Sequence, residues 1–415
     1  MVRILDRPVV VISAARTPVG RFDGILAPYD AVELGAGAIE GAIQRSGLRP
    51  DEIDTATMGF VVSAGYGEAP AKEAALRAGI PETVHARSVD AVCGSAMDAI
   101  AISAELLLAG AAEVAVAGGM ESRSNAPYLL GPHFWKSGSG YQRGGRVKVK
   151  RAGAYRFAFS EDIEEQLRLV EMKDSTAYDG LFWVREKKFM REYALDFAKK
   201  MGYAVEQVNE CAAESHRKAW EAARTGAFAD EIVPVGEAVH DELISEEKQQ
   251  QIVAENPDDI ASAFNASAPA DGGAAIIMAT RETAERLNAP MMARILGYAR
   301  TDGPAPDFLH RPVDAVNELR AGLAKAGDSG PFDIIEANEA FGVQLPLFFE
   351  AFSPMKINVH GGAIALGHPF GAAGARILTT LLYAMKRHNN RRGLAAICFG
   401  SGGGYAMAVE REESR

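Results

Sequence analysis

Three short runs of small residues in this 415-residue chain hold side chains that could carry out chemistry together. The runs are Val92-Cys93-Gly94-Ser95-Ala96, Gly367-His368-Pro369 and Cys398-Phe399-Gly400-Ser401-Gly402-Gly403-Gly404. The side chains are two thiols and one imidazole, and their small neighbours leave room for a large substrate. A thiol nucleophile with a basic imidazole and a second thiol favours covalent acyl transfer with a separate proton shuttle.

Cys93 directly precedes a stretch with helical apolar periodicity, so its sulfur is predicted to lie at a helix N-terminus. Unpaired N–H groups and the positive end of the helix dipole favour a thiolate there, and we expect a lowered pKa. The alternative is a buried, inert core cysteine, which is a common fate of a lone cysteine.

His368 lies between a glycine and a proline, a sequence typical of a fixed turn. A histidine held in this way is predicted to be a positioned base with a pKa near neutrality. The alternative is a histidine that only hydrogen-bonds the turn that holds it.

Cys398 precedes glycines at 400 and 402–404, a spacing that lets backbone N–H groups point into a cavity, as an oxyanion hole requires. A tight turn or a phosphate-binding loop remains an alternative. A nucleotide-binding oxidoreductase is disfavoured, because no Gly-x-Gly-x-x-Gly run follows the opening strand.

Strand and helix patterns alternate along both ends of the chain, which predicts a mostly parallel sheet covered by helices. In the first third, strands are expected at 9–14, 55–62 and 113–117, and helices at 31–46, at 69–78 and after Cys93. The last third repeats this order, with helices at 312–326 and 373–387 and strands at 332–337, 394–399 and 405–409. The repetition predicts two similar halves whose turns, with Cys93 and His368, meet at their interface.

The domain organisation that follows is α/β, with duplicated halves and an inserted loop and helix domain. The N-terminal half covers 1–121, with a return segment at about 265–285, and the C-terminal half covers 286–415. The insert covers 122–264, with helices expected at 161–172, 187–201 and 206–225, and it is predicted to cover the active site. Five basic residues within 143–151 indicate a solvated loop, or else a surface for phosphates or subunit contacts.

Composition excludes several classes of protein. A net charge of −11 disfavours nucleic acid as a partner. No apolar run reaches the roughly 20 residues that span a bilayer, so no membrane insertion is expected. Three cysteines fit free thiols in a reducing compartment. The chain contains no Cys-x-x-Cys or His-Glu-x-x-His spacing, so a metal site is disfavoured. The chain enters an apolar strand without a signal or transit peptide, and a cytoplasmic location is expected.

The three runs, in this order, resemble the thiolase family, the acetyl-CoA acetyltransferases and 3-ketoacyl-CoA thiolases. The resemblance covers nearly the whole chain through five further blocks: Ile12-Ser13-Ala14-Ala15-Arg16-Thr17-Pro18, Ala117-Gly118-Gly119-Met120-Glu121-Ser122, Asn265-Ala266-Ser267, Asn338-Glu339-Ala340-Phe341 and Asn358-Val359-His360-Gly361-Gly362. It implies a thiolase fold and acyl-CoA:acetyl-CoA C-acyltransferase activity in fatty acid or lipid metabolism. It also implies coenzyme A and acyl-CoA as substrates, no permanently bound cofactor, and a homodimer or homotetramer.

The resemblance implies a role for each matching residue. Cys93 matches the nucleophile that carries the acyl group, His368 the base that activates it, and Cys398 the acid/base at the α-carbon of acetyl-CoA. Asn338 matches an asparagine that positions a water in one oxyanion hole. The N–H groups of Cys93 and Gly400 match the other hole.

Substrate contacts are implied in the same way. Ser267 matches a serine that lines the pantetheine tunnel, and Met190 and Phe341 match residues that bind substrate or coenzyme A. Phe189-Met190-Arg191 stands where the family carries His-Met-Gly, so a larger or differently shaped acyl pocket is predicted. Two alternatives stay open. One is an acyl-CoA- or lipid-binding protein on the same fold with weak or no catalysis. The other is a decarboxylating condensing enzyme, which usually needs a second histidine in place of Cys398.

Overall fold

The computed structural model describes residues 1–130, 149–151, 157–159, 172–255 and 258–412. Its main feature is a mixed sheet in the order β15-β14-β16-β17-β13-β1-β12-β5-β3-β4, with the short strand β2 (Gly20–Arg21) paired to β12. Small two-stranded ribbons lie outside this sheet. The order divides at the pairing of β1 with β13 into two halves of five strands each.

The N-terminal half contains strands that run mostly in one direction. β3 pairs in parallel with β4 and β5, while β12 runs antiparallel to β5 and β1. Four of the five strands therefore point the same way, and β12 opposes them. The bounds are β1 (Val2–Arg16), α1 (Ala31–Ser46), η1 (Pro50–Glu52), β3 (Thr55–Gly59), α2 (Pro70–Arg77), β4 (His85–Val89), α3 (Ser95–Leu108), β5 (Val114–Glu121), β12 (Ala270–Thr280) and α9 (Arg281–Arg286).

The C-terminal half repeats this arrangement. β14 pairs in parallel with β15 and β16, and β17 runs antiparallel to β16 and β13. The predicted duplication thus matches the strand order. The bounds are β13 (Ala293–Asp302), η3 (Ala305–Asp307), α10 (Arg311–Lys325), β14 (Ile334–Ala337), α11 (Gln344–Phe352), β15 (Lys356–Ile357), α12 (Ala363–Leu366), η4 (Phe370–Ala372), α13 (Ala373–Arg387), β16 (Arg392–Phe399) and β17 (Gly403–Arg411).

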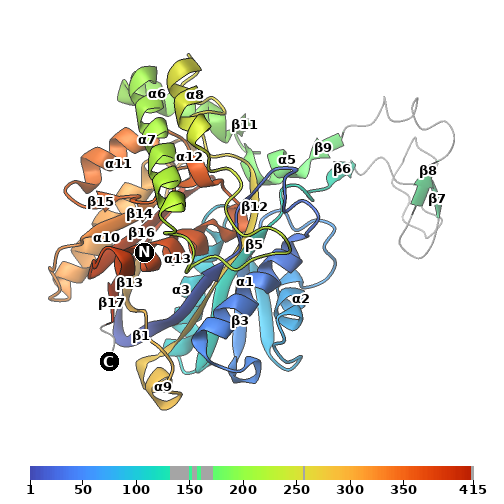
Figure 1. Cartoon of the computed structure of the whole chain (residues 1–415), viewed down its shortest axis with the longest axis vertical. Coiled ribbons are helices and arrows are strands. Elements are labelled where there is room, and N and C mark those ends of the chain that lie inside the picture. Colours follow the sequence, from blue (N-terminus) through green and yellow to red (C-terminus); the bar gives the residue numbers. More distant parts are fainter. Residues whose placement is uncertain (131–148, 152–156, 160–171, 256–257, 413–415) are drawn as a thin grey trace.

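Helices α3 and α13 pack against each other and against one face of the sheet. On the other face, α1 covers the N-terminal half and α10 covers the C-terminal half (Figure 1). α13 contacts strands of both halves, and most of its residues are buried. The chain approaches α13 through a close contact at Gly371. A Cβ there would lie 2.5 Å from the Met120 carbonyl oxygen, so only glycine fits. This contact brings the start of α13 beside the end of β5.

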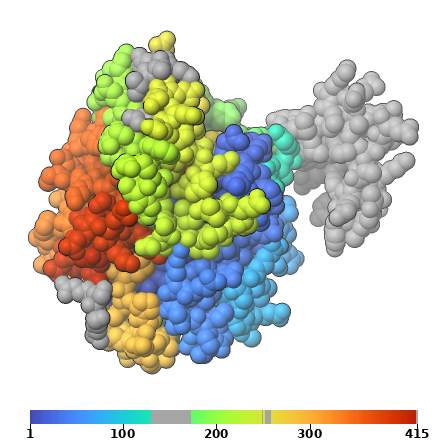
Figure 2. Space-filling model, viewed as in Figure 1, coloured from blue at the N-terminus to red at the C-terminus, as the bar shows by residue number. Residues whose placement is uncertain are grey.

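The segment between β5 and β12 lies across the junction of the two halves, as Figure 2 shows in green and yellow. Arg16 of β1 anchors this segment to the sheet. The buried guanidinium of Arg16 donates hydrogen bonds to Glu231 at 2.6 Å and to Asp241 at 2.6 and 2.8 Å. The bounds are β6 (Tyr128–Leu130), β7 (Val149–Arg151), β8 (Phe157–Phe159), β9 (Met172–Asp174), α5 (Ser175–Leu181), β10 (Phe182–Trp183), β11 (Lys188–Phe189), α6 (Met190–Met201), α7 (Val205–Arg224) and α8 (Glu246–Glu255).

Most predicted elements occur within a few residues of their expected bounds, and those at 31–46 and 373–387 match fully. The helix expected from 187 begins only at Met190, because Lys188 and Phe189 pair with β10. The helix expected at 161–172 and most of the basic cluster lie outside the described residues. The domain limits at 122 and 264 stay a prediction.

Glu121, at the end of β5, joins three parts of the fold. Its buried carboxylate accepts hydrogen bonds from the N–H groups of Val61 at 3.3 Å, Val62 at 3.2 Å and Gly371 at 2.9 Å. Burial raises its pKa to about 7. Because the folded protein then binds this proton more tightly than the unfolded chain, stability from this group falls as pH rises from 4.5 to about 7.

Glu121→Leu should lower the free energy of unfolding by about 3 kcal/mol or more at pH 7, because three buried N–H groups lose their acceptor. Urea denaturation measures this effect. The control Glu237→Leu changes an exposed carboxylate and should shift stability by about 0.5 kcal/mol or less. Equal stability of the two variants would contradict the role assigned to Glu121.

Candidate active site

Cys93 and His368, which lie 275 residues apart in the sequence, are in direct contact. The Nε2 of His368 lies 3.1 Å from the Sγ of Cys93, and both side chains are buried. Cys93 stands just before Gly94, the N-cap of α3, as the apolar pattern predicted. The expected meeting of the two turns at the interface of the halves is confirmed.

The backbone before Cys93 is strained, which the sequence did not indicate. Val92 has φ of 51°, a conformation that is a genuine outlier for a β-branched residue. Neighbouring side chains hold it there, since Ser95 Oγ donates to the Val92 carbonyl at 2.5 Å and Asp90 accepts from the Val92 N–H at 2.9 Å. The strained turn aims the Cys93 sulfur at the imidazole.

The loop between α12 and η4 presents His368. Gly367 has φ of 100°, and a Cβ there would lie 2.7 Å from the Ala270 side chain. The N–H of His368 donates to the Ala268 carbonyl at 2.9 Å, so the return segment holds the loop. The Phe370 ring meets the imidazole edge-on at 5.4 Å between centroids, which limits its rotation.

Cys398 lies in β16, one residue before its end, and its side chain is buried. Gln344 of α11 donates to its sulfur at 3.7 Å and to the Leu309 carbonyl at 3.0 Å. The following turn closes when the Gly402 N–H donates to the Phe399 carbonyl at 3.1 Å, with φ of 101° at Gly402. A positive φ of this size favours glycine, and the loop is a tight turn, which was one of the alternatives that the glycine run left open.

Burial controls the protonation of these three groups, and two expectations were wrong. Burial raises the pKa of the Cys93 thiol above its usual value, with Cys398 a second cause, where a lowered value was expected. Burial also lowers the pKa of His368 to about 3, where a value near neutrality was expected. Burial raises the pKa of Cys398 to about 12. At neutral pH the resting site therefore holds a thiol beside a neutral imidazole, the form that can accept a proton.

The protonated state of Cys93 should determine how the rate of alkylation by iodoacetamide depends on pH in the free protein. Because a thiolate is the reactive form and the pKa of Cys93 is raised, inactivation should accelerate about tenfold per pH unit from pH 7 to 9. Stopped-time activity assays measure the rate. A plateau already reached at pH 7 would instead indicate a stable thiolate–imidazolium pair.

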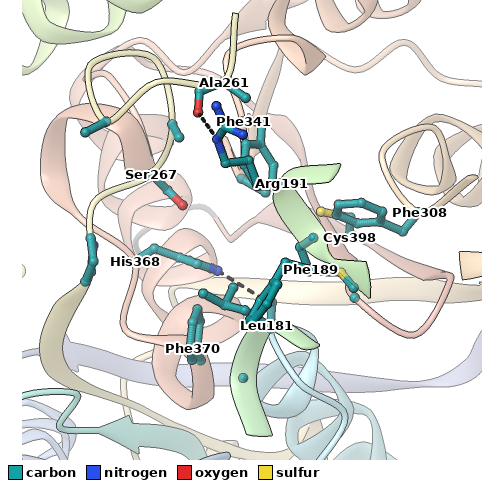
Figure 3. Close-up of a pocket in the computed structure, with 18 of the residues that line it drawn as sticks. Leu181, Phe189, Arg191, Ala261, Ser267, Phe308, Phe341, His368, Phe370 and Cys398 are labelled. Carbon is teal, nitrogen blue, oxygen red and sulfur yellow. Dashed lines mark hydrogen bonds between the residues drawn. The ribbon is translucent and has the colours of Figure 1, made fainter. Parts of the chain in front are cut away.

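One cavity of 610 Å³ contains most of the predicted site. Cys93, His368, Cys398 and Gly400 line it together, as do the predicted substrate contacts Ser267, Met190 and Phe341. In Figure 3, Ser267, His368 and Phe370 lie on one side, and Phe308 and Cys398 lie on the other. Phe189 and Arg191 also contribute to the lining, so the altered run at 189–191 does reach the pocket.

Asn338 is the predicted residue that does not belong to this lining. It directly follows β14, is fully buried, and its N–H donates to the Ala396 carbonyl at 2.8 Å. Neither atom of its side-chain amide has a partner among the described residues. A buried amide of this kind requires a hydrogen-bonding partner, and the described residues do not supply one.

Three charged residues of the cavity lining were not identified from the sequence: Arg123, Glu192 and Asp259. Arg123, two residues after β5, lines the cavity and is only 6% exposed. It follows the Gly118–Ser122 block, but nothing in the local pattern indicated that its side chain turns inward.

The described residues hold no cluster of three or more possible metal ligands from His, Cys, Asp and Glu. Among the same residues, none of the helices combines the length and apolar character needed to cross a membrane.

A duplicated α/β fold, with a buried cysteine–histidine pair and a second cysteine in one cavity, defines a cysteine-dependent acyltransferase. The chain belongs to the thiolase family. The family's N-terminal domain matches residues 9–282 and its C-terminal domain matches residues 289–411.

Curated relatives are similar over almost their whole length. An acetyl-CoA acetyltransferase of Escherichia coli is 37% identical over 97% of this chain and 98% of its own. One from Cupriavidus necator is 36% identical over 97% and 99%. Among solved structures, a thiolase of Ascaris suum in complex with coenzyme A superposes with a TM-score of 0.83 at 32% identity, covering 98% of this chain and all of its own.

Proposed function

We propose that this chain is an acyl-CoA:acetyl-CoA C-acyltransferase that works through an acyl-cysteine intermediate. The observation that carries the proposal is the 3.1 Å contact between His368 and Cys93 in a cavity that Cys398 also lines. It supports a reaction in which Cys93 is the nucleophile, His368 is its base and Cys398 is a separate proton donor.

In thiolysis, His368 accepts the proton of Cys93 as the sulfur attacks the ketone carbon of a 3-ketoacyl-CoA. The bond between the α- and β-carbons then breaks, and its electron pair leaves as the enolate of acetyl-CoA. Cys398 protonates that carbon, and the acyl group remains on Cys93 as a thioester. The thiol of a free coenzyme A then attacks this thioester and releases Cys93. Condensation runs the same steps in reverse.

Two oxyanion sites would stabilise these steps. The N–H groups of Cys93 and Gly400 form one, for the oxygen of the acyl group bound to Cys93. A water held by Asn338, together with the imidazole of His368, forms the other, for the enolate. The unpartnered, buried amide of Asn338 supports this second site, since a water fits where protein partners are lacking.

Ser267, Met190 and Phe341 would contact coenzyme A and the acyl group from the cavity wall. A second cavity of 850 Å³ shares Gly180, Leu181, Met190 and Gly400 with the first, and Phe182 and Trp183 line it. This aromatic extension supports the larger acyl pocket that the run at 189–191 predicted.

The testing experiment is thiolysis of acetoacetyl-CoA and of an eight-carbon 3-ketoacyl-CoA with free coenzyme A, followed by loss of enolate absorbance. Incubation with acetyl-CoA alone should add one acetyl group to the peptide that contains Cys93, by mass spectrometry. Tight binding of both thioesters with neither turnover nor acetylation would favour the alternative, a binding protein on this fold.

We also propose a homodimer or homotetramer in the cytoplasm, with a role in fatty acid or lipid metabolism. β4 supports assembly, because it ends the sheet and pairs only with β3 among the described strands. An unpaired edge of this kind is suited to pairing with a second chain. Light scattering of the purified protein measures the assembly.

A further inference from the structure

Arg123 carries a buried positive charge beside the reacting groups. Its Nε donates to the Thr176 hydroxyl at 2.6 Å, and its guanidinium carbon lies 4.2 Å from the centre of the Phe370 ring. That ring in turn meets the imidazole of His368. The hydroxyl and the ring hold the guanidinium in one position on the cavity wall.

No carboxylate pairs with Arg123 in the described part of the chain. Three acidic side chains are near enough to affect it, but each is engaged elsewhere. Glu121 accepts from three backbone N–H groups, Asp271 accepts from the Ser124 N–H at 3.0 Å, and Asp174 accepts from the Thr176 N–H at 2.9 Å. Among the described residues, the terminal N–H groups of this cavity-lining guanidinium therefore have no hydrogen-bond partner.

Arg123 keeps its charge at neutral pH, although burial lowers its pKa to about 10. Leaving a charged group out of water without a partner is costly, and buried arginines are normally paired. The rest of the lining is mostly apolar apart from Arg191, Glu192 and Asp259, and an acetyl group offers a guanidinium only one neutral carbonyl oxygen. A carboxylate can accept two parallel N–H bonds from its planar fork.

We propose that Arg123 selects acyl-CoA substrates whose acyl chain ends in a carboxylate, so that the preferred substrates are 3-ketoacyl thioesters of dicarboxylic acids. This assignment rests on the proposed thiolase function and specifies its substrate class. The terminal carboxylate pairs with Arg123 while the ketone carbon lies at Cys93. The bond to Arg123 positions the acyl chain and takes no part in the chemical step.

The test compares two six-carbon 3-ketoacyl-CoA substrates, one ending in a carboxylate and one in a methyl group. We expect wild type to favour the carboxylate at least tenfold in kcat/KM. Arg123→Met, similar in length but uncharged, should lower the ratio of kcat/KM for the carboxylate substrate to kcat/KM for the methyl-ended substrate at least 30-fold. Arg123→Lys should recover part of the loss. The control Arg320→Met alters an exposed arginine and should change neither rate.

Several outcomes would overturn the assignment. A wild-type preference for the methyl-ended substrate would do so. Equal losses on both substrates in Arg123→Met would show instead that the charge acts on Cys93 or on folding, and circular dichroism separates those two. Calorimetry of both thioesters with Cys93→Ser measures binding without turnover. It therefore distinguishes failure of the charge selection from failure of the proposed thiolase reaction. Selective, Arg123-dependent binding without turnover in wild type would sustain the charge selection and reject the thiolase reaction. Equal binding would reject the selection.

Discussion

Replacing Cys93 by alanine should abolish thiolysis of acetoacetyl-CoA, with a fall in kcat of more than about 10,000-fold. The sulfur is the only group within reach of the His368 Nε2 that can form the acyl intermediate among the described cavity residues. Without it, the base has no nucleophile to activate. Loss of enolate absorbance measures the rate, and the acetylated peptide should disappear from the mass spectrum.

Cys211→Ala is the matched control for this change. Cys211 lies on α7, is only partly buried and does not line the cavity. Its replacement should leave thiolysis within about twofold of wild type, as expected of a residue away from the site. If Cys93→Ala kept more than a hundredth of the activity with an intact fold, the acyl-cysteine mechanism would be wrong.

Replacing Cys398 by alanine should separate the two halves of the reaction. Thiolysis and condensation should fall by about 100- to 10,000-fold, the range typical of losing a general acid or base. Exchange of the acetyl group between acetyl-CoA and a labelled coenzyme A should continue near the wild-type rate, because it needs only Cys93 and His368. Radiolabel exchange measures the second activity.

Loss of both activities in Cys398→Ala would indicate that the residue supports the structure of the site and not proton transfer alone. Cys398→Ser provides the control, since a hydroxyl preserves the contact with Gln344 but transfers protons to carbon less readily than a thiol. It should keep the fold and the exchange activity, and recover little thiolysis.

The protonation of the site shows where local sequence reasoning fails. The helix start after Cys93 was predicted correctly, and the dipole effect expected there favours a thiolate. In the structure, burial outweighs that effect, and the pKa of Cys93 rises while that of His368 falls. Burial depends on segments hundreds of residues away, which no local pattern describes.

The features of Val92 and Arg123 were missed for a similar reason, because both depend on contacts with other side chains. Val92 adopts its strained φ because Ser95 and Asp90 hold it, against the preference of a β-branched residue. Arg123 turns inward because Thr176 and Phe370, from two other parts of the chain, receive it. A basic residue after a glycine-rich strand is normally expected at the surface.

The sequence by itself determined the α/β alternation, the duplication and the family, because periodicity, glycine spacing and ordered motifs are local properties of the chain. It also identified Cys93, His368, Cys398 and Gly400 as residues of one site. Only the tertiary structure decided that Cys93 is a protonated thiol beside a neutral imidazole, that Asn338 is buried and not part of the cavity lining, and that Arg123 places a charge in the cavity. Desolvation and unpaired charge depend on the packing of distant segments, so they exist only once the chain has folded.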